Sequence, residues 1–183
     1  MKTWLWISWL FIFKCVSTAD RNFRISFDDV NIKIFNSDLI EKFDCQVLQM
    51  DNKSYVNCQV LVKTYVGQMK ARSTLDFWKP NGQAMKLFDV QLDACLFIGS
   101  VHKNRFFNIF AKALKKFSNL KCPLKPNFTY TLKNLYLDEN DFPAFVPIGR
   151  FRSQTEFYIN ESTGRATRVV VNGKILPRRS TTL

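Results

Sequence analysis

Few residues of this chain could perform acid–base or nucleophilic chemistry. His102 is the only histidine among the 183 residues, so a serine–histidine or cysteine–histidine set has one base at most to be built around. Asp138, Glu139 and Asp141 lie close together, and paired carboxylates can hydrolyse glycosidic bonds. These three occupy a polar segment that ends at Pro143, a composition typical of a turn. The sequence also lacks a glycine-rich phosphate loop, and we expect no enzymatic activity and no cofactor.

The cysteines indicate disulfides instead of a metal site. The sequence has no Cys-x-x-Cys pair and a single histidine, so it lacks the ligand spacing of a structural zinc site, and we expect no metal. Beyond residue 20 it has four cysteines, which allow three pairings. We favour one pair that staples a hairpin turning at residues 50–53 and one that clamps the ends of a helical insertion: Cys45–Cys58 and Cys95–Cys122.

The first nineteen residues have the features of a secretory signal peptide. Lys2 precedes a ten-residue apolar run, and small residues follow at 17–19. A membrane-spanning helix needs about 20 apolar residues, and this run is half that length and meets Lys14. A short core helix is the alternative, but residues 4–13 lack a polar face. We predict cleavage after Ala19, which removes Cys15 as well, and secretion of the mature chain to the extracellular space.

Three glycosylation sequons agree with secretion. None has proline in its middle position, and each would place its asparagine on the surface: Asn52, Asn127 and Asn160. The mature chain, residues 20–183, suits one domain that can bury a substantial core, with a frayed tail from about residue 177.

The chain is basic, with a formal net charge of +12 that is spread along its length. In a nuclear protein this charge would suggest nucleic acid. For a secreted protein we expect no nucleic-acid partner, and the candidates become an anionic membrane surface, an acidic glycan or a receptor.

Alternation of apolar and polar residues with period two dominates the chain and predicts short strands. We expect them near residues 23–27, 30–34, 58–66, 69–77, 88–96, 128–137, 151–159 and 167–175. Between residues 103 and 120 the apolar spacing changes to three and four, which predicts one amphipathic helix. The predicted fold is mainly β: an antiparallel immunoglobulin-like β-sandwich of 7–9 strands with one helix across an end or open face.

A family resemblance rests on several segments of the second half of the chain. They are Asp93-Ala94-Cys95, Cys122-Pro123-Leu124, residues 130–134 and the proline-rich residues 142–152. The chain resembles an insect secreted family that carries domain of unknown function 1091, which is similar in outline to the MD-2-related lipid-recognition sandwiches. The resemblance implies two sheets that can spread to admit acyl chains. Pro143, Pro147 and Gly149 suit a rigid loop and a tight turn, so the shared pattern assigns no ligand residue.

The sequence therefore favours a non-catalytic, secreted protein that binds a lipid or another apolar ligand. The 18 phenylalanines suit either a large aromatic core or a cavity lined by rings. The candidate lining residues are Phe88, Phe97, Phe106, Phe110, Phe117, Phe128, Phe151 and Phe157. The alternative is an extracellular interaction domain that binds a receptor or an acidic glycan without a small-molecule ligand; the same strands and disulfides would serve it.

Overall fold

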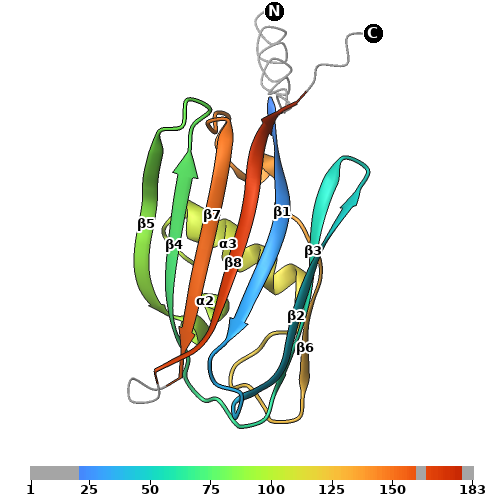
Figure 1. Cartoon of the computed structure of the whole chain (residues 1–183), viewed down its shortest axis with the longest axis vertical. Coiled ribbons are helices and arrows are strands. Elements are labelled where there is room, and N and C mark those ends of the chain that lie inside the picture. Colours follow the sequence, from blue (N-terminus) through green and yellow to red (C-terminus); the bar gives the residue numbers. More distant parts are fainter. Residues whose placement is uncertain (1–20, 160–163, 179–183) are drawn as a thin grey trace, which may run out of the picture.

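The computed structural model of the chain describes residues 21–159 and 164–178. The expected signal peptide, Asn160 and residues 179–183 of the tail lie outside these ranges. Within them, eight strands form two antiparallel sheets that face each other (Figure 1). The larger sheet has the order β1 (Phe23–Ile34), β8 (Arg165–Pro177), β7 (Gly149–Tyr158), β4 (Lys70–Trp78) and β5 (Ala84–Asp93). The smaller has the order β2 (Ile40–Met50), β3 (Lys53–Val62) and β6 (Thr129–Leu135).

The two α-helices of the described residues lie on the same side of the large sheet as the small sheet. They are α2 (Ala94–Gly99) and α3 (Arg105–Phe117), and a 3-10 turn, η1 (Glu139–Asp141), precedes β7. Helix α3 crosses behind the large sheet (Figure 1), and its buried residues Ile109 and Ala113 belong to the hydrophobic core. The predicted mainly β, antiparallel two-sheet fold with one longer helix and two disulfides is confirmed.

A β-bulge joins two of the predicted strands into one. The pairing of β1 with β8 shifts register between Phe27 and Asp29. Side chains alternate between the two faces of a strand. The extra residue of the bulge therefore moves the apolar residues of β1 from odd to even sequence positions while they keep facing the interior. Phe27 and Val30 consequently share the inner face of the large sheet, and β1 runs without a break from one end of the molecule to the other.

The β2–β3 hairpin has the predicted position and the predicted staple. Asp51 and Asn52 form its two-residue turn and both have positive φ, 49° and 61°. Two such residues match the right-handed twist of the flanking strands. Cys45 pairs with Cys58 across the ladder, with 4.1 Å between Cα atoms, and their sulfurs are bonded.

The prediction that the fifth strand continues to residue 96 is wrong. Strand β5 stops at Asp93, whose carboxylate accepts a hydrogen bond of 2.8 Å from the Leu96 amide and begins helix α2. Helix α3 is shorter than predicted at both ends, because Asn104 caps its first turn and Ser118 its last. The disulfide between Cys95 and Cys122 ties α2 to the segment before β6.

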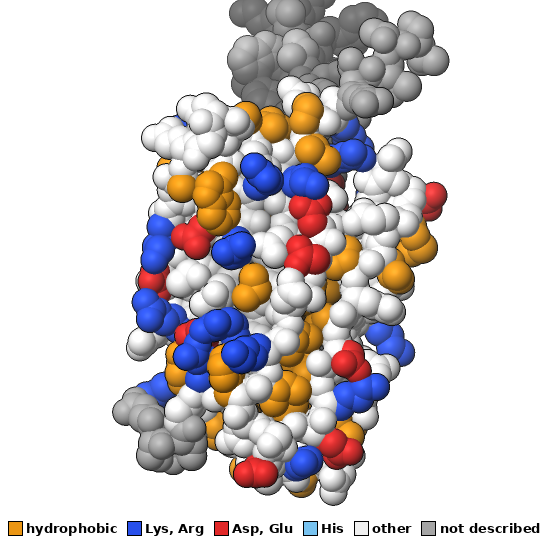
Figure 2. Space-filling model, viewed as in Figure 1, with side chains coloured by type: hydrophobic (Ala, Val, Ile, Leu, Met, Phe, Trp, Pro, Cys, Tyr) orange, Lys and Arg blue, Asp and Glu red, His pale blue; other side chains and the backbone are white. Residues whose placement is uncertain are grey.

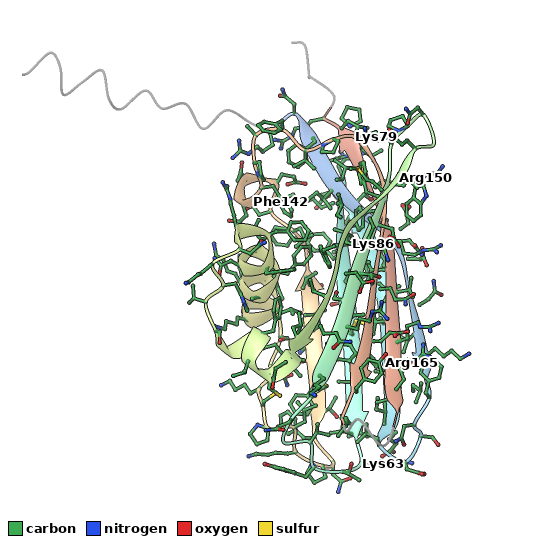
Figure 3. The ribbon with its side chains drawn as sticks, turned by 90° about the vertical axis from the view of Figure 1, so that its left-hand side faces the viewer. Lys63, Lys79, Lys86, Phe142, Arg150 and Arg165 are labelled. Atoms are coloured by element: carbon green, nitrogen blue, oxygen red, sulfur yellow. A yellow bond between two sulfur atoms is a disulfide. The ribbon has the colours of Figure 1, made fainter. Side chains whose placement is uncertain are left out.

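Most of the buried apolar residues fall into two separate clusters; Ala71, Leu75, Ala94, Ile98 and Ala111 are buried but belong to neither. The first gathers around the start of β1 and helix α3: Phe23, Ile25, Phe27, Val56, Phe77, Ile109, Ala113, Leu137, Phe142 and Ile175. Figure 3 shows Phe142 near the end of the helix, on the side of the sheet that the helix covers. The second gathers around the start of β2: Leu39, Ile40, Val62, Val66, Leu124, Tyr130 and Ala166. Because β1 and its partners span the length of the sandwich, the two clusters anchor its opposite ends.

In the part of the chain that the structure describes, the helices are too short or too polar to cross a bilayer.

Candidate functional site

The middle of the large sheet's inner face contains several side chains that are only partly buried, beside the buried Ala71 and Leu75. Strands β4 and β7 lie in the interior of that sheet. Their residues Ser73 and Thr155 pair with each other, and Ser73 pairs on its other side with Val90 of β5. Thr155 pairs in turn with Val169 of β8. All four are only partly buried. A side chain on a central strand can be exposed only through a face of the sheet, so Ser73, Thr155 and Val169 are reached from the space between the layers, whereas Val90 lies on the edge strand β5.

Three hydroxyl side chains occupy this region. The Ser73 and Thr155 hydroxyl oxygens are hydrogen-bonded at 3.0 Å. Ser153 lies two residues from Thr155 on the same face, where it pairs with the buried Leu75. We call Ser73, Ser153 and Thr155 the hydroxyl patch. Sandwich interiors are normally filled by large apolar side chains at native density, and three short hydroxyl side chains fill less of this space.

Three apolar neighbours of the hydroxyl patch belong to neither core cluster, whereas Phe151 and Val171, next to Ser153, pack against the first. Val90, Phe157 and Val169 lie on the inner face, as their register partners show. Each is partly exposed, and none is in the two clusters or among the side chains packed against them. Apolar surface that remains accessible inside a sandwich is surface that a ligand can cover.

A surface hollow lies beside this region at the free edge of the large sheet. It measures about 430 Å³, within the usual range for small-molecule sites. Its lining comes from β5, α2 and the start of α3: Val90, Gln91, Leu92, Asp93, Leu96, Phe97, Ser100, His102 and Phe107. We call it the β5 hollow. Because Val90 lines it and also pairs with Ser73, the hollow adjoins the hydroxyl patch.

Aromatic rings connect the β5 hollow with helix α3. The centroid of Phe107 lies 6.3 Å from that of Phe97 and 5.4 Å from that of Phe88, and Phe88 lies 5.6 Å from Phe106. Phe106 lies 4.8 Å from Phe110 on the next turn of the helix. Four of the predicted lining residues are thus neighbours. Phe107, which the sequence analysis assigns to the helix but not to the lining, completes the series.

The other predicted lining residues lie elsewhere. Phe151 packs edge-on against Phe27 beside the first core cluster, and Phe117 contacts Tyr136. Phe157 lies on the inner face beside the hydroxyl patch, as described above. Phe128 is 44% exposed and lies against Tyr130 in the second core cluster, at the other end of the sandwich. The structure therefore does not bring Phe128 together with the rings of helix α3.

The residues considered for catalysis have structural contacts. Asp138 caps the 3-10 turn through its hydrogen bond to the Asn140 amide, and Glu139 accepts a hydrogen bond from the Ile25 amide at 3.2 Å. Asp141 pairs with Lys112 of α3. His102 stacks on Phe97 at 4.5 Å and is hydrogen-bonded through Nε2 to the carbonyl of that residue at 2.7 Å. The described residues contain no group of three or more His, Cys, Asp or Glu that could hold a metal.

The outer face of the large sheet carries mixed charge (Figure 2). Figure 3 shows Arg150 and Arg165 on the side of the sheet away from helix α3. Several cations of this face are neutralised by carboxylates: Arg72 and Lys86 by Asp89, and Lys174 by Asp28. Hydrogen bonds from Arg72, the largest influence, and Lys86 lower the pKa of Asp89 to about 2.

Glu156 is the one acidic residue of the described chain that is classed as buried, at 8% exposure. It accepts hydrogen bonds of 2.8 Å from the Tyr158 hydroxyl and from Arg168, and it pairs with Arg165. Burial is the largest single influence and raises its pKa, but these partners together outweigh it, so the pKa lies below the ordinary value. The guanidinium groups of Arg165 and Arg168 also lie over the ring of Phe35.

Two predicted glycosylation sites can be placed. Asn52 and Asn127 are exposed, and both have positive φ at a turn of the chain. Their position leaves room for a glycan at each.

A second hollow, of about 310 Å³, lies where β7 begins and β8 ends, and Arg150 and Lys174 are among its lining residues. It is at the end of the sandwich away from the β5 hollow.

The chain was compared with known proteins. Residues 67–153 match the family described as "Protein of unknown function (DUF1091)", which confirms the resemblance to that family over this range. Curated proteins gave no match. Among solved structures, the chain is similar to a Niemann-Pick type C2 protein from the Japanese carpenter ant, with 16% identity, a TM-score of 0.31, and coverage of 82% of this chain and 91% of that one. It is also similar to the structural genomics target SoR45, with 11% identity, a TM-score of 0.27, and coverage of 90% and 92%.

Proposed function

We propose that the protein is a secreted, non-catalytic carrier or sensor that holds a lipid or another apolar ligand between its large sheet and helix α3. The observation that carries this proposal is the accessible apolar surface inside the sandwich. Val90, Phe157 and Val169 face the interior, yet they remain partly exposed and lie outside both core clusters.

The energetics favour occupation of this space. Covering apolar surface is worth roughly 25 cal/mol for each Å² removed from water, so the inner face gains free energy when an apolar ligand covers it. The β5 hollow supplies an approach from solvent, because Val90 lies both in its wall and on the inner face. The two core clusters, the first of which includes Ile109 and Ala113 of helix α3, hold the layers together beside this surface.

An extracellular setting agrees with the disulfides. Cys45–Cys58 and Cys95–Cys122 use every cysteine of the described residues. Structural disulfides persist in oxidising compartments and are rare in the cytosol. The predicted signal peptide at residues 1–19 and the exposed sequon residues Asn52 and Asn127 point the same way.

The alternative, binding of an acidic glycan or receptor, depends on positive charge. On the outer face of the large sheet, Arg72, Lys86 and Lys174 are engaged by carboxylates of the same face. An acidic partner would have to displace these carboxylates, so this face provides less attraction than its number of cations indicates.

The test is to express the full chain in insect cells, purify the secreted protein without detergent, and measure its mass by native mass spectrometry before and after organic extraction. We expect a stoichiometric ligand mass or, after extraction, saturable uptake of a fluorescent fatty probe. Val90→Trp should reduce uptake by filling the wall of the β5 hollow. Leu87→Trp is the control, because Leu87 is 49% exposed on the same strand and does not line the hollow. A clean protein mass together with no probe uptake would refute the proposal and favour the interaction domain.

A further inference from the structure

We infer that the ligand is a neutral amphiphile with a single hydroxyl or carbonyl group, and that the hydroxyl patch binds this group. The inference rests on the proposed function and specifies the chemical class of the ligand. It assigns a role in specificity to Ser73, Ser153 and Thr155.

The hydroxyl patch is arranged to receive one polar group. The hydroxyl oxygens of Ser73 and Thr155 are 3.0 Å apart. Ser153 lies two residues before Thr155 on β7, which places the two residues about 7 Å apart along the strand. A ligand oxygen that lies against the inner face at this point is within reach of at least two of the three side chains.

These hydroxyls have hydrogen-bonding capacity left over. Each hydroxyl can donate one hydrogen bond and accept two. The bond between Ser73 and Thr155 uses one donor and one acceptor, which leaves a donor and three acceptor positions on the pair. Ser153 adds a further hydroxyl on the same face. The patch can therefore both donate to a carbonyl and accept from an alcohol.

The surroundings disfavour a charged group at this position. Residues that pair across the five strands form rows on the inner face, and the patch occupies two neighbouring rows in which every residue is uncharged. The first row is Phe88, Leu75, Ser153, Val171 and Val30, and the second is Val90, Ser73, Thr155, Val169 and Ile32. The neighbouring cations Arg72 and Arg168 alternate to the outer face, where Asp89 and Glu156 engage them. A carboxylate or phosphate would be buried without a partner, at a large cost in free energy.

The position of the patch also orients the ligand. Ser73 is one strand inward from Val90, and Thr155 is two strands inward, which corresponds to about 5 and 10 Å at the spacing of paired strands. The polar group thus lies deep between the layers. The apolar remainder extends past Val90 toward the rings of Phe97 and Phe107 in the wall of the β5 hollow.

The experiment uses a series of ligands that share a 16-carbon chain: hexadecane, 1-hexadecanol and palmitate, each titrated against a fluorescent fatty probe bound to the extracted protein. We expect the alcohol to bind about 3- to 10-fold tighter than the alkane, which is the range of one net hydrogen bond, and palmitate to bind weakest at neutral pH. In Ser73→Ala/Thr155→Val the alcohol should lose this advantage, while the affinity for the alkane is retained.

Thr74→Val is the matched control, because Thr74 neighbours Ser73 on β4 but lies on the opposite face, where it pairs with Gln154. Retained alkane affinity in the double variant shows that its site is folded. Equal binding of all three compounds, or tightest binding of palmitate, would overturn the inference and leave the proposed function intact. An equal loss of alcohol preference in Thr74→Val would also overturn it. Binding of none of the three, nor of the probe, would overturn the proposed function and this inference with it.

Discussion

Truncation of two phenylalanines on the same sheet should have very different costs if the interior is packed at its ends and open in its middle. Phe77 is 1% exposed and belongs to the first core cluster. Phe157 faces the same interior from the adjacent strand, but it is partly exposed and lies outside both clusters. The chemical change from Phe to Ala is identical at the two positions, so the difference in unfolding free energy reports the packing.

The expected magnitudes follow from burial. Phe77→Ala removes a fully packed ring and leaves a cavity, which costs about 3–5 kcal/mol. Phe157→Ala loses only part of the transfer free energy of a ring, about 1.5–3 kcal/mol when complete, and opens onto space that is already accessible. We expect a cost of about 1 kcal/mol and, in addition, weaker binding of the fatty probe.

Urea unfolding of the ligand-free protein measures both costs. Trp78 is the only tryptophan beyond residue 20 and lies on β4 beside Phe77, so its fluorescence follows unfolding of the large sheet. Equal destabilisation by Phe77→Ala and Phe157→Ala would show that the middle is packed as tightly as the ends, and would refute the reasoning behind the proposed site.

Three further predictions concern the frame around the site. Gly173→Ala should destabilise the fold by about 1–3 kcal/mol, because its Cβ would lie 2.5 Å from a backbone carbonyl oxygen of β1; Gly99→Ala, with no atom within 4 Å of the new Cβ, should be neutral or slightly stabilising in thermal unfolding. Asp89→Asn should lower the urea midpoint at pH 7 but not at pH 2: the pKa of Asp89 is lowered from 3.8 to about 2 in the folded protein, so its contribution is present above the ordinary pKa and is lost as the pH falls through the folded value. A midpoint difference that is constant with pH would contradict this assignment. Replacing Cys95 and Cys122 by alanine opens a link across 27 residues of sequence and should cost about 3–4 kcal/mol in the same assay; an unchanged midpoint would contradict it.

Much of the fold follows from local patterns in the sequence. The alternation along β4, β7 and β8 and the period of helix α3 identify these elements, because each has one apolar and one polar face. The hairpin turn at Asp51 and Asn52 also follows. The cysteines allow three pairings by count, and the favoured one, which fits the predicted elements, is the one in the structure.

The remaining features depend on signals that are short or ambiguous. Helix α2 has six residues, less than two turns, so its apolar residues continue the alternation of β5 as well as they start a helix; the capping carboxylate of Asp93 decides between the two. The bulge after Phe27 shifts the apolar residues from odd to even positions but keeps them on the same face, so that one strand resembles two in the sequence.

The candidate site was only half predictable. The abundance of phenylalanine indicates aromatic rings but not which rings meet. Phe88 reaches Phe106 and Phe107 only because helix α2 and the caps at Asp93, Ser100 and Asn104 turn the chain between them. Ser153 and Thr155 had a visible signal, because they occupy the apolar phase of their strand between Phe151 and Phe157. A polar residue in that phase signals either an unfilled interior or a binding group, and only the register with Ser73 shows that the hydroxyls lie together.

The division of the core into two end clusters has a consequence for how such a protein can diversify. Fully buried residues such as Phe77 and Val66 stabilise the fold from the two core clusters. The side chains that would touch a ligand are partly exposed, and we expect them to contribute less to the free energy of folding. After gene duplication, the middle rows can therefore exchange residues and acquire new ligand preferences while the scaffold keeps its thermal tolerance. Selection on ligand preference can then act on a handful of positions without first having to repair the fold.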